Sequence, residues 1–357
     1  MSLSRTDRTI DEMKKLGITQ LMVTDPDSIL YYTGIYNSPF ERFWGFLIKA
    51  DGEHVLFANK LFRLRPIDCR VVVFDDVDPL TEVVCPHLEP GLFGVDGNMA
   101  ARFLLPIAKA VPGLEPVLAQ SCISSARSRK DEEEKENMRI ASRINDETMA
   151  KVRDFIHEGA TENEIAAFIK KCYSQAGAGG ESFTPIVCFG AHASDPHHHP
   201  TDTVLKDGDC ILIDMGCKWN GYCSDMTRTF YWKTVSDEDR KIYEITLEAN
   251  LKGIAAVKAG RPFKEVDLAA RDHIASFGYG PNFTHRLGHG IGIAEHEGDD
   301  VSQVNDHLIE KDMCFSIEPG IYLSGKTGVR IEDLVIATED GCELLNHFSK
   351  ELTVLGV

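Results

Sequence analysis

Short apolar segments alternate with longer amphipathic ones in the first third of the chain. Residues 10–16 carry apolar side chains at helical spacing and lead into a short apolar run at residues 20–24. Further strands are predicted at the apolar runs 45–49, 55–57, 70–74 and 92–95. Asp51-Gly52 predicts the tight turn of a hairpin between the first two of these runs. Together the segments predict an α/β domain over residues 1–124.

The polar run Ser124–Glu136 separates this region from the rest of the chain. It mixes both signs of charge, which is typical of a domain junction that leads into a helix. Apolar residues at helical spacing then predict a long helix and, after Gly159, a second helix. Three pairs have the spacing of a helix N-cap and its partner, namely Ser128 and Asp131, Thr161 and Glu164, and Ser236 and Asp239. We therefore expect a second domain over residues 125–357.

A short similarity links the two halves of this second domain. The segments GATENEIAA from Gly159 and GRPFKEVDLAA from Gly260 share a glycine, a glutamate five residues later and a β-branched residue after it. Each segment connects one predicted helix to another. The pattern predicts two copies of a helix–helix–strands unit, with functional side chains on strands of both copies.

The segment Cys210–Trp232 reads as a β-hairpin. Asn220-Gly221 is a strong signal for a two-residue turn, because both residue types tolerate positive φ. Counting outward from this turn makes Asp214 and Asp225 diagonal neighbours on one face. Two carboxylates among apolar neighbours are costly unless a cation neutralises them, which predicts a divalent metal.

Composition limits the class of protein. The 357 residues are 43% hydrophobic and 26% charged, as in a soluble globular protein. The net charge of −18 argues against nucleic acid and anionic membrane as partners. The first residues lack an apolar signal segment, and ten scattered cysteines read as free thiols, so we expect a cytoplasmic protein.

The second copy contains more side chains that bind metals. Histidines and carboxylates stand in His285-Arg-Leu-Gly-His289-Gly-Ile-Gly, Ala294-Glu-His296-Glu, Ser316-Ile-Glu318-Pro-Gly-Ile-Tyr322 and Gly328-Val-Arg330-Ile-Glu332-Asp333. Apolar residues alternate with Glu318 and Glu332, which places both on strands or at strand ends.

Taken in order, these motifs resemble the pita-bread metallopeptidases, which include Xaa-Pro dipeptidases (prolidases), Xaa-Pro aminopeptidases and methionine aminopeptidases. The resemblance implies an α+β pita-bread catalytic domain with a pseudo-twofold repeat, preceded by a smaller creatinase-like N-terminal α/β domain. It places the five metal ligands of the family on Asp214, Asp225, His289, Glu318 and Glu332.

The resemblance also implies roles for these ligands. Asp225 and Glu332 would bridge two metal ions, Asp214 would bind one ion, and His289 and Glu318 would bind the other. An oxygen-rich site favours Mn²⁺ or Co²⁺, with Zn²⁺ as a further alternative. A metal-bridging hydroxide would attack the carbonyl, with Glu318 as general base and acid.

Five more residues match positions around the metals in the family. His197 and His296 would act in catalysis by donating hydrogen bonds to the substrate and to the oxyanion. His285, Tyr322 and Arg330 match positions of the substrate pocket, although Arg330 could equally serve as the partner of a carboxylate. The remaining histidines of the tract, His198 and His199, read as solvated, and His192 departs from the family pattern.

The expected activity is hydrolysis of the bond before proline in short peptides, by a homodimer. A dipeptidase and an aminopeptidase are both compatible with the motifs, whereas methionine aminopeptidases generally lack the N-terminal domain. Two alternatives stay open at this point: a metal-free amidinohydrolase like creatinase, and a non-catalytic binding protein on the same fold.

Overall fold

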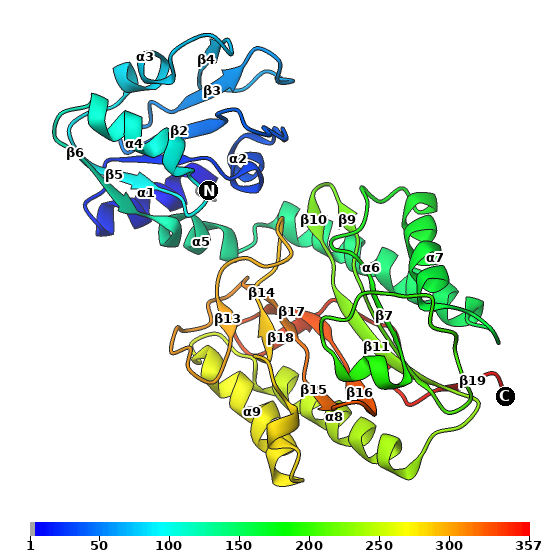
Figure 1. The fold of residues 1–357 in the computed structure, drawn as a ribbon. Coiled ribbons are helices and arrows are strands. Elements are labelled where there is room, and N and C mark those ends of the chain that lie inside the picture. The colour runs from blue at the N-terminus through cyan, green and yellow to red at the C-terminus, as the bar shows by residue number, and fades with distance from the viewer. Residues whose placement is uncertain (1–3) are drawn as a thin grey trace. The chain divides into compact units, whose positions relative to one another are not determined.

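A computed structural model describes residues 4–357. The chain divides into two compact units that meet between Arg127 and Ser128. Figure 1 labels the elements of each unit. The boundary predicted after residue 124 falls inside helix α5 (Gln120–Ser128), and we keep the division into residues 1–124 and 125–357 as a proposal.

Among residues 4–127, the N-terminal unit is built on a six-stranded sheet in the order β4-β3-β2-β1-β5-β6. The strands are β1 (Gln20–Val23), β2 (Gly45–Lys49), β3 (Val55–Asn59), β4 (Arg70–Phe74), β5 (Gly91–Val95) and β6 (Leu114–Leu118). The predicted hairpin is present, since β2 and β3 pair in antiparallel fashion around the turn at Gly52.

Helices cover both faces of this sheet. Buried side chains of α1 (Arg5–Lys15), α2 (Pro26–Thr33) and α5 pack on one face. Side chains of α3 (Leu80–Val84) and α4 (Ala101–Ala110) pack on the other, near the 3-10 turn η1 (Cys85–His87). This arrangement confirms the predicted α/β architecture of the N-terminal region.

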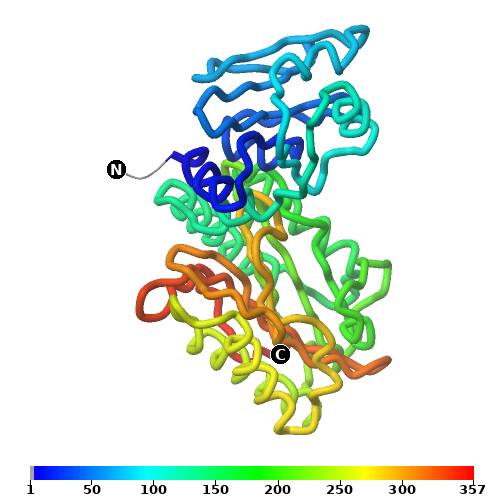
Figure 2. Tube along the Cα trace, turned by 90° about the vertical axis from the view of Figure 1, so that its left-hand side faces the viewer, coloured from blue at the N-terminus to red at the C-terminus, as the bar shows by residue number. Residues whose placement is uncertain are grey.

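The C-terminal unit contains two helix pairs and several short sheets (Figures 1 and 2). The helices are α6 (Glu132–Phe155), α7 (Glu162–Gln175), α8 (Asp237–Ala256) and α9 (Phe263–Ser276), with 3-10 turns η2 (Gly190–Ser194) and η3 (Gly280–Asn282). The strands of the first half are β7 (Ile186–Phe189), β8 (Cys210–Met215), β9 (Lys218–Trp219), β10 (Tyr222–Cys223) and β11 (Met226–Trp232). Those of the second half are β12 (Gly288–His289), β13 (Asp300–Val301), β14 (Cys314–Ile317), β15 (Gly320–Leu323), β16 (Thr327–Arg330), β17 (Asp333–Ala337) and β18 (Cys342–Leu344).

The two halves repeat the same construction. In the first half α6 and α7 pack on the sheet β19-β11-β8-β7, where β19 is Val354–Leu355. In the second half α8 and α9, side by side in Figures 1 and 2, pack on β14, β17 and their neighbours. Asn145 of α6 donates to the carbonyl of Met215 at 2.8 Å, and Asn250 of α8 donates to that of Ile317 at 3.0 Å. Each asparagine thus secures the end of a strand that has a predicted ligand at or directly after its last residues.

Helix caps follow the sequence in two of three predicted cases. Thr161 accepts from the Glu164 N–H at 3.2 Å, and Ser236 caps α8 in the same way. The pair Ser128–Asp131 was wrongly predicted, because Asp131 itself caps α6 in a reciprocal box with Glu134. The capping carboxylate and the acidic first turn of α6 face the positive end of the helix dipole, which favours this start. In the described range every helix is too short or too polar to span a bilayer.

Candidate metal centre and active site

The hairpin of the first half carries two of the predicted ligands. Asn220 and Gly221 both have positive φ, 49° and 88°, as the two-residue turn requires. The ladder between β8 and β11 pairs Asp214 with Thr227, which is the predicted register. Asp214 and Asp225 therefore reach the same cavity wall, in a cavity of about 420 Å³.

Three ligands come from the second half. His289 lies on β12, Glu318 follows β14 and Glu332 directly precedes β17. The Nε2 atom of His289 is 3.4 Å from Oε1 of Glu318 and 3.8 Å from Oδ2 of Asp225. One ligand atom each of Asp225, His289 and Glu332 lies within 4.8 Å of the others. All five predicted ligands line the one cavity, so the structure brings both halves together there.

The oxygens of this cluster are those expected of a cation site. Within residues 4–357, one carboxylate oxygen each of Asp214, Asp225 and Glu332 is buried and has no hydrogen-bond partner. A buried polar atom without a partner is costly, and a buried carboxylate more so. Four carboxylates and one imidazole fit divalent cations that prefer oxygen ligands. The donor set present here therefore fits a metal centre.

Electrostatics in the cavity point the same way. Burial raises the pKa of Asp225 well above its usual value, and the charges of Glu332 and Asp214 raise it further. Burial and the charges of Glu318 and Asp214 also raise the pKa of Glu332 well above its usual value. Burial raises the pKa of Glu318 to about 7, with a further contribution from Asp214 and an opposing one from Arg330. Positive charge in the cavity would return these groups to their anionic forms.

His289 is prepared as a neutral ligand. Burial, followed by the neighbouring His296, lowers the pKa of His289 to about 3. Its Nδ1 lies 3.2 Å from the carbonyl oxygen of Gly290, which suits an Nδ1–H donor. The Nε2 lone pair then faces Glu318 and Asp225 and is free to bind a metal.

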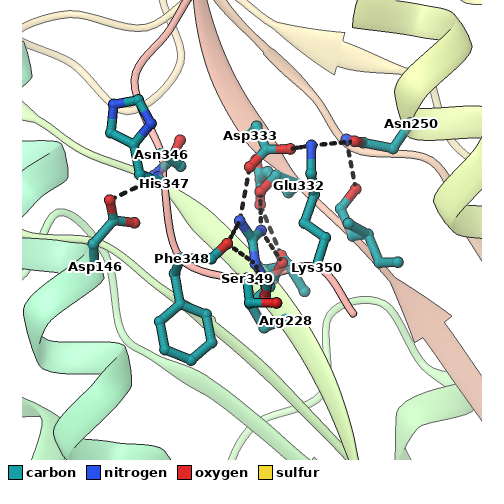
Figure 3. Close-up of polar contacts among 12 residues, drawn as sticks. Asp146, Arg228, Asn250, Glu332, Asp333, Asn346, His347, Phe348, Ser349 and Lys350 are labelled. Atoms are coloured by element: carbon teal, nitrogen blue, oxygen red, sulfur yellow. Dashed lines mark hydrogen bonds and ion pairs between the residues drawn. The ribbon is translucent and has the colours of Figure 1, made fainter. Parts of the chain in front are cut away.

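A buried arginine holds Glu332 and the start of β17 (Figure 3). Arg228 donates to the backbone carbonyl of Glu332 at 2.6 Å and to Oδ1 of Asp333 at 2.8 Å. Arg228 also donates to the backbone carbonyls of Thr227, Phe348 and Ser349. Lys350 binds the other oxygen of Asp333 at 2.7 Å. The segment near the C-terminus thus completes the support of one ligand, which the sequence did not reveal.

The three predicted pocket residues form one hydrogen-bonded chain. Arg330 donates to Oδ2 of Asp214 at 2.7 Å and to the Tyr322 hydroxyl at 3.1 Å. Nε2 of His285 lies 2.8 Å from that hydroxyl. Arg330 is therefore the partner of a carboxylate, which is one of the two roles predicted for it. His285 and Arg330 line the cavity. Tyr322 is not among the lining residues and contacts the cavity wall through these two side chains.

The two predicted catalytic histidines lie in the cavity wall on different loops. The ring of His296 is 3.9 Å from that of His289, centroid to centroid. His197 is exposed, and its backbone N–H donates to Asp195 at 3.0 Å. Both imidazoles are available to a molecule that enters the cavity. Their roles stay a prediction.

Several residues of the site escaped the sequence reading. Arg286 and Glu295 line the cavity with the apolar side chains of Phe183, Ile186 and Pro196. Arg286 could have been noticed, because it stands between two predicted site residues in the HRLGHG motif. His198 was wrongly predicted to be solvated, because it and His192 both lie within hydrogen-bond distance of the buried carboxylate of Glu162. His199 is exposed, as predicted.

Comparison with known proteins decides the family. Residues 136–339 match the description of metallopeptidase family M24, and residues 5–129 match the creatinase/prolidase N-terminal domain. The chain belongs to metallopeptidase family M24. This membership confirms the predicted family, and it agrees with a cavity lined by carboxylates and histidines.

Individual relatives match nearly the whole chain. An uncharacterized peptidase of Staphylococcus aureus (strain MSSA476) is 36% identical over 353 residues, which are 98% of this chain and 100% of the relative. The recombinant prolidase from Thermococcus sibiricus has a TM-score of 0.93 at 31% identity and covers 99% of this chain and 100% of its own. The X-Pro aminopeptidase from Thermotoga maritima has a TM-score of 0.85 at 30% identity, covering 97% and 100%. The pita-bread fold with a creatinase-like N-terminal domain is thereby confirmed.

Proposed function

We propose that this M24 metallopeptidase hydrolyses the peptide bond before proline and releases the N-terminal residue of short Xaa-Pro peptides. The observation that carries the proposal is the group of buried, partnerless carboxylate oxygens on Asp214, Asp225 and Glu332 beside the neutral His289. Two divalent ions, with Mn²⁺ as the first choice, would be held by these residues and Glu318. When bound, such ions lower the pKa of water and polarise a carbonyl group.

The side chains of the cavity suit the remaining steps. In this proposal Glu318 would accept the proton of the attacking water and pass it to the proline nitrogen as the C–N bond breaks. His197 and His296 can donate hydrogen bonds to the carbonyl oxygen, on which negative charge develops. Proline lacks an N–H and has a fixed φ, so a site that binds the ring needs no partner for that hydrogen. Phe183, Ile186 and Pro196 provide an apolar wall for the ring.

Arg286 favours a dipeptidase. Its side chain is 39% exposed in the cavity wall, with Nη1 3.9 Å from Asp300 and Nη2 3.3 Å from Nδ1 of His296. These contacts are long for a guanidinium, which leaves donors for a carboxylate. In a Xaa-Pro dipeptide that carboxylate is on the proline itself, one residue from the bond that breaks.

The first experiment compares a Xaa-Pro dipeptide with a Xaa-Pro-Xaa tripeptide after metal stripping and addition of Mn²⁺ or Co²⁺. We expect metal-dependent cleavage of the dipeptide, and none in Asp225→Asn. Cleavage of the tripeptide with little of the dipeptide would instead identify an aminopeptidase. Cleavage of neither, with metal bound, would overturn proline specificity. Hydrolysis of creatine without metal would identify the amidinohydrolase alternative. A protein that binds no metal and hydrolyses neither peptide nor creatine under any of these conditions would favour a binding protein.

Arg286→Gln tests the dipeptidase assignment. We expect kcat/KM for the dipeptide to fall about 10- to 100-fold, mostly through KM, because a hydrogen bond to a charged group contributes about 1.5–3 kcal/mol. The control substrate is the C-terminal amide of the same dipeptide, for which the variant and the wild type should differ little. An equal loss on both substrates would contradict carboxylate recognition.

A further inference from the structure

A second polar cluster lies outside the carboxylate centre, between α7 and the loop after β7. Glu162, the first residue of α7, has a fully buried side chain, 0% exposed. Nδ1 of His192 is 2.8 Å from one of its oxygens, and Nε2 of His198 is 2.9 Å from the other. The two imidazole rings lie close together, with centroids 4.2 Å apart.

The carboxylate of Glu162 accepts further hydrogen bonds from the end of β7 and from the loop that follows it. The Phe189 N–H donates to Oε1 at 2.8 Å. The N–H and the hydroxyl of Thr201 donate to Oε2 at 3.0 and 2.7 Å. Burial by itself raises the pKa of Glu162, but these donors and the histidines outweigh it, and the pKa lies below its usual value. Glu162 is thus a charged anchor with both oxygens satisfied.

Hydrogen bonding explains this cluster better than a bound metal does. Two histidines and a glutamate could hold a metal ion. Ligand atoms of one tetrahedral zinc ion, with bonds of about 2.0–2.1 Å, would be roughly 3.3 Å apart. The observed 2.8 and 2.9 Å are instead the usual lengths of N–H···O hydrogen bonds.

The loop between the two histidines carries a predicted catalytic residue. Its first part rests on β16, where a Cβ at Gly328 would lie 1.9 Å from the Ala193 carbonyl oxygen. The chain then passes through Pro196 and His197, which line the cavity. His198 and Thr201 follow at once and are tied back to Glu162. The exposed His197 is therefore the chain neighbour of an anchored residue.

We propose that Glu162 is a positioning residue that sets the orientation of His197 through His198, His192 and Thr201. The catalytic part of this inference rests on the proposed function. Glu162 lies on a different element from the carboxylate centre and touches it through none of the contacts described above. Its contribution is to hold one face of the loop, so that the imidazole of His197 points into the cavity.

Glu162→Gln tests the proposal, because an amide NH₂ cannot accept the hydrogen bonds of one carboxylate oxygen. We expect kcat for the Xaa-Pro substrate to fall about 10- to 100-fold with little change in KM, since a hydrogen-bond donor in the transition state is displaced. The control is Glu164→Gln, the same change one half-turn along α7 at a side chain that is 43% exposed. The control should retain wild-type kinetics.

A double mutant separates positioning from general damage. In a His197→Ala background, Glu162→Gln should change kcat less than about twofold, because the group that Glu162 positions is already gone. Multiplicative effects of the two substitutions would overturn the proposal. If Glu162→Gln fails to fold, Thr201→Val removes a single donor to the same carboxylate and should give a smaller fall in kcat, again absent in the His197→Ala background.

A measurement that does not depend on substrate turnover, the NMR resonance of the His197 imidazole, separates this inference from the proposed function. The imidazole resonance of His197, assigned with His197→Gln in histidine-labelled protein, should shift or broaden in Glu162→Gln and not in Glu164→Gln. An unchanged resonance overturns the positioning role whatever the substrate is. A zinc equivalent bound by the wild type and lost in Glu162→Gln would also overturn it, in favour of a metal site. A wild type inactive on Xaa-Pro peptides, with the His197 resonance shifted as expected, overturns only the proposed function.

Discussion

Gly216 and Gly288 lie beside the carboxylate centre, one in each half of the C-terminal unit. A Cβ on Gly216 would lie 2.0 Å from the carbonyl oxygen of Ser224, and one on Gly288 would lie 2.0 Å from that of Ser316. Ser224 directly precedes the candidate ligand Asp225, and Gly288 directly precedes the candidate ligand His289. Because backbone cannot move aside as a flexible side chain can, only glycine permits this approach.

Gly216→Ala should therefore destabilise the fold and displace Asp225. We expect the free energy of unfolding to fall by about 1–3 kcal/mol, as for other overpacked sites, together with weaker metal binding. Urea unfolding and metal titration measure the two effects. Gly341→Ala is the matched control, because no heavy atom lies within 4 Å of its added Cβ. Equal stability of the two variants would contradict the steric argument.

At the residue scale, the sequence predicted those site residues that belong to short local motifs. Asp214 and Asp225 could be paired by counting from a two-residue turn, and the structure has that register. The role of His198 could not be read, because its partner Glu162 lies 36 residues away on another element. A histidine that binds a distant carboxylate has no local signal in one sequence. The same holds for Arg228, whose partners Glu332 and Asp333 lie more than a hundred residues along the chain.

At the scale of elements, the ladder between β8 and β11 is joined to the start of β17 by a buried ion pair. Arg228 on β11 has a side chain that is 1% exposed, and its partner Asp333 on β17 is 0% exposed. A buried ion pair that loses one partner leaves an uncompensated charge in a medium that solvates it poorly. The pair therefore couples the two strands that deliver ligands from opposite halves.

Arg228→Met should be strongly destabilising, by about 3–5 kcal/mol, since within residues 4–357 Asp333 would keep only Lys350 as a charged partner. Chemical denaturation checks this value. Arg143→Met, at an exposed position of α6, is the control and should stay within about 0.5 kcal/mol of the wild type. A loss of the same small size in both variants would show that the buried pair contributes little.

Helix α6 is also linked to strand β18, by Arg139 and Glu343. Nε and Nη2 of Arg139 donate to the two oxygens of Glu343 at 2.6 and 2.9 Å, and this hydrogen bonding lowers the pKa of Glu343. A lowered pKa in the folded state gives stability that is present above the unfolded value, about 4.3, and is lost as the pH falls through the folded value.

Glu343→Gln should thus be less stable than the wild type at pH 7, and the difference in stability should shrink as the pH is lowered toward 3. Glu343 is 37% exposed, so solvent screening keeps the difference at pH 7 below about 1 kcal/mol. This corresponds to a decrease of at most about 2–4 °C in Tm, measured by calorimetry at both pH values. A difference that does not depend on pH would rule out the ion pair as its source.

Two of the elements that were not predicted from the sequence break a local rule. Helix α4 contains Pro106, which removes a backbone donor and normally argues against a helix interior. Strand β6 contains Pro116, and it is tolerated because β6 is the edge of its sheet. Both elements are stabilised by contacts distant in sequence. The long helices α6 and α8 have caps and helical spacing along their own length, and these could be predicted.

At the scale of the whole molecule, the carboxylate centre should make stability depend on metal. Removing the cation leaves several buried carboxylates close together, and a ligand present at about 100 times its Kd stabilises the folded state by about 2.7 kcal/mol. Chelation should lower Tm of the wild type by roughly 5–10 °C. Asp225→Asn should show a much smaller shift in differential scanning fluorimetry. Insensitivity of the wild type to chelation would argue against a metal held by these residues.

The separation of the ligands between the two halves has a further consequence. Asp214 and Asp225 precede the loop after Trp232, whereas His289, Glu318 and Glu332 follow it. A chain cut in that loop would yield two fragments, each with an incomplete coordination set, while the C-terminal strand β19 still pairs with β11 of the other fragment. Such fragments would form a split enzyme, in which substrate turnover would require and therefore indicate association of the two fragments.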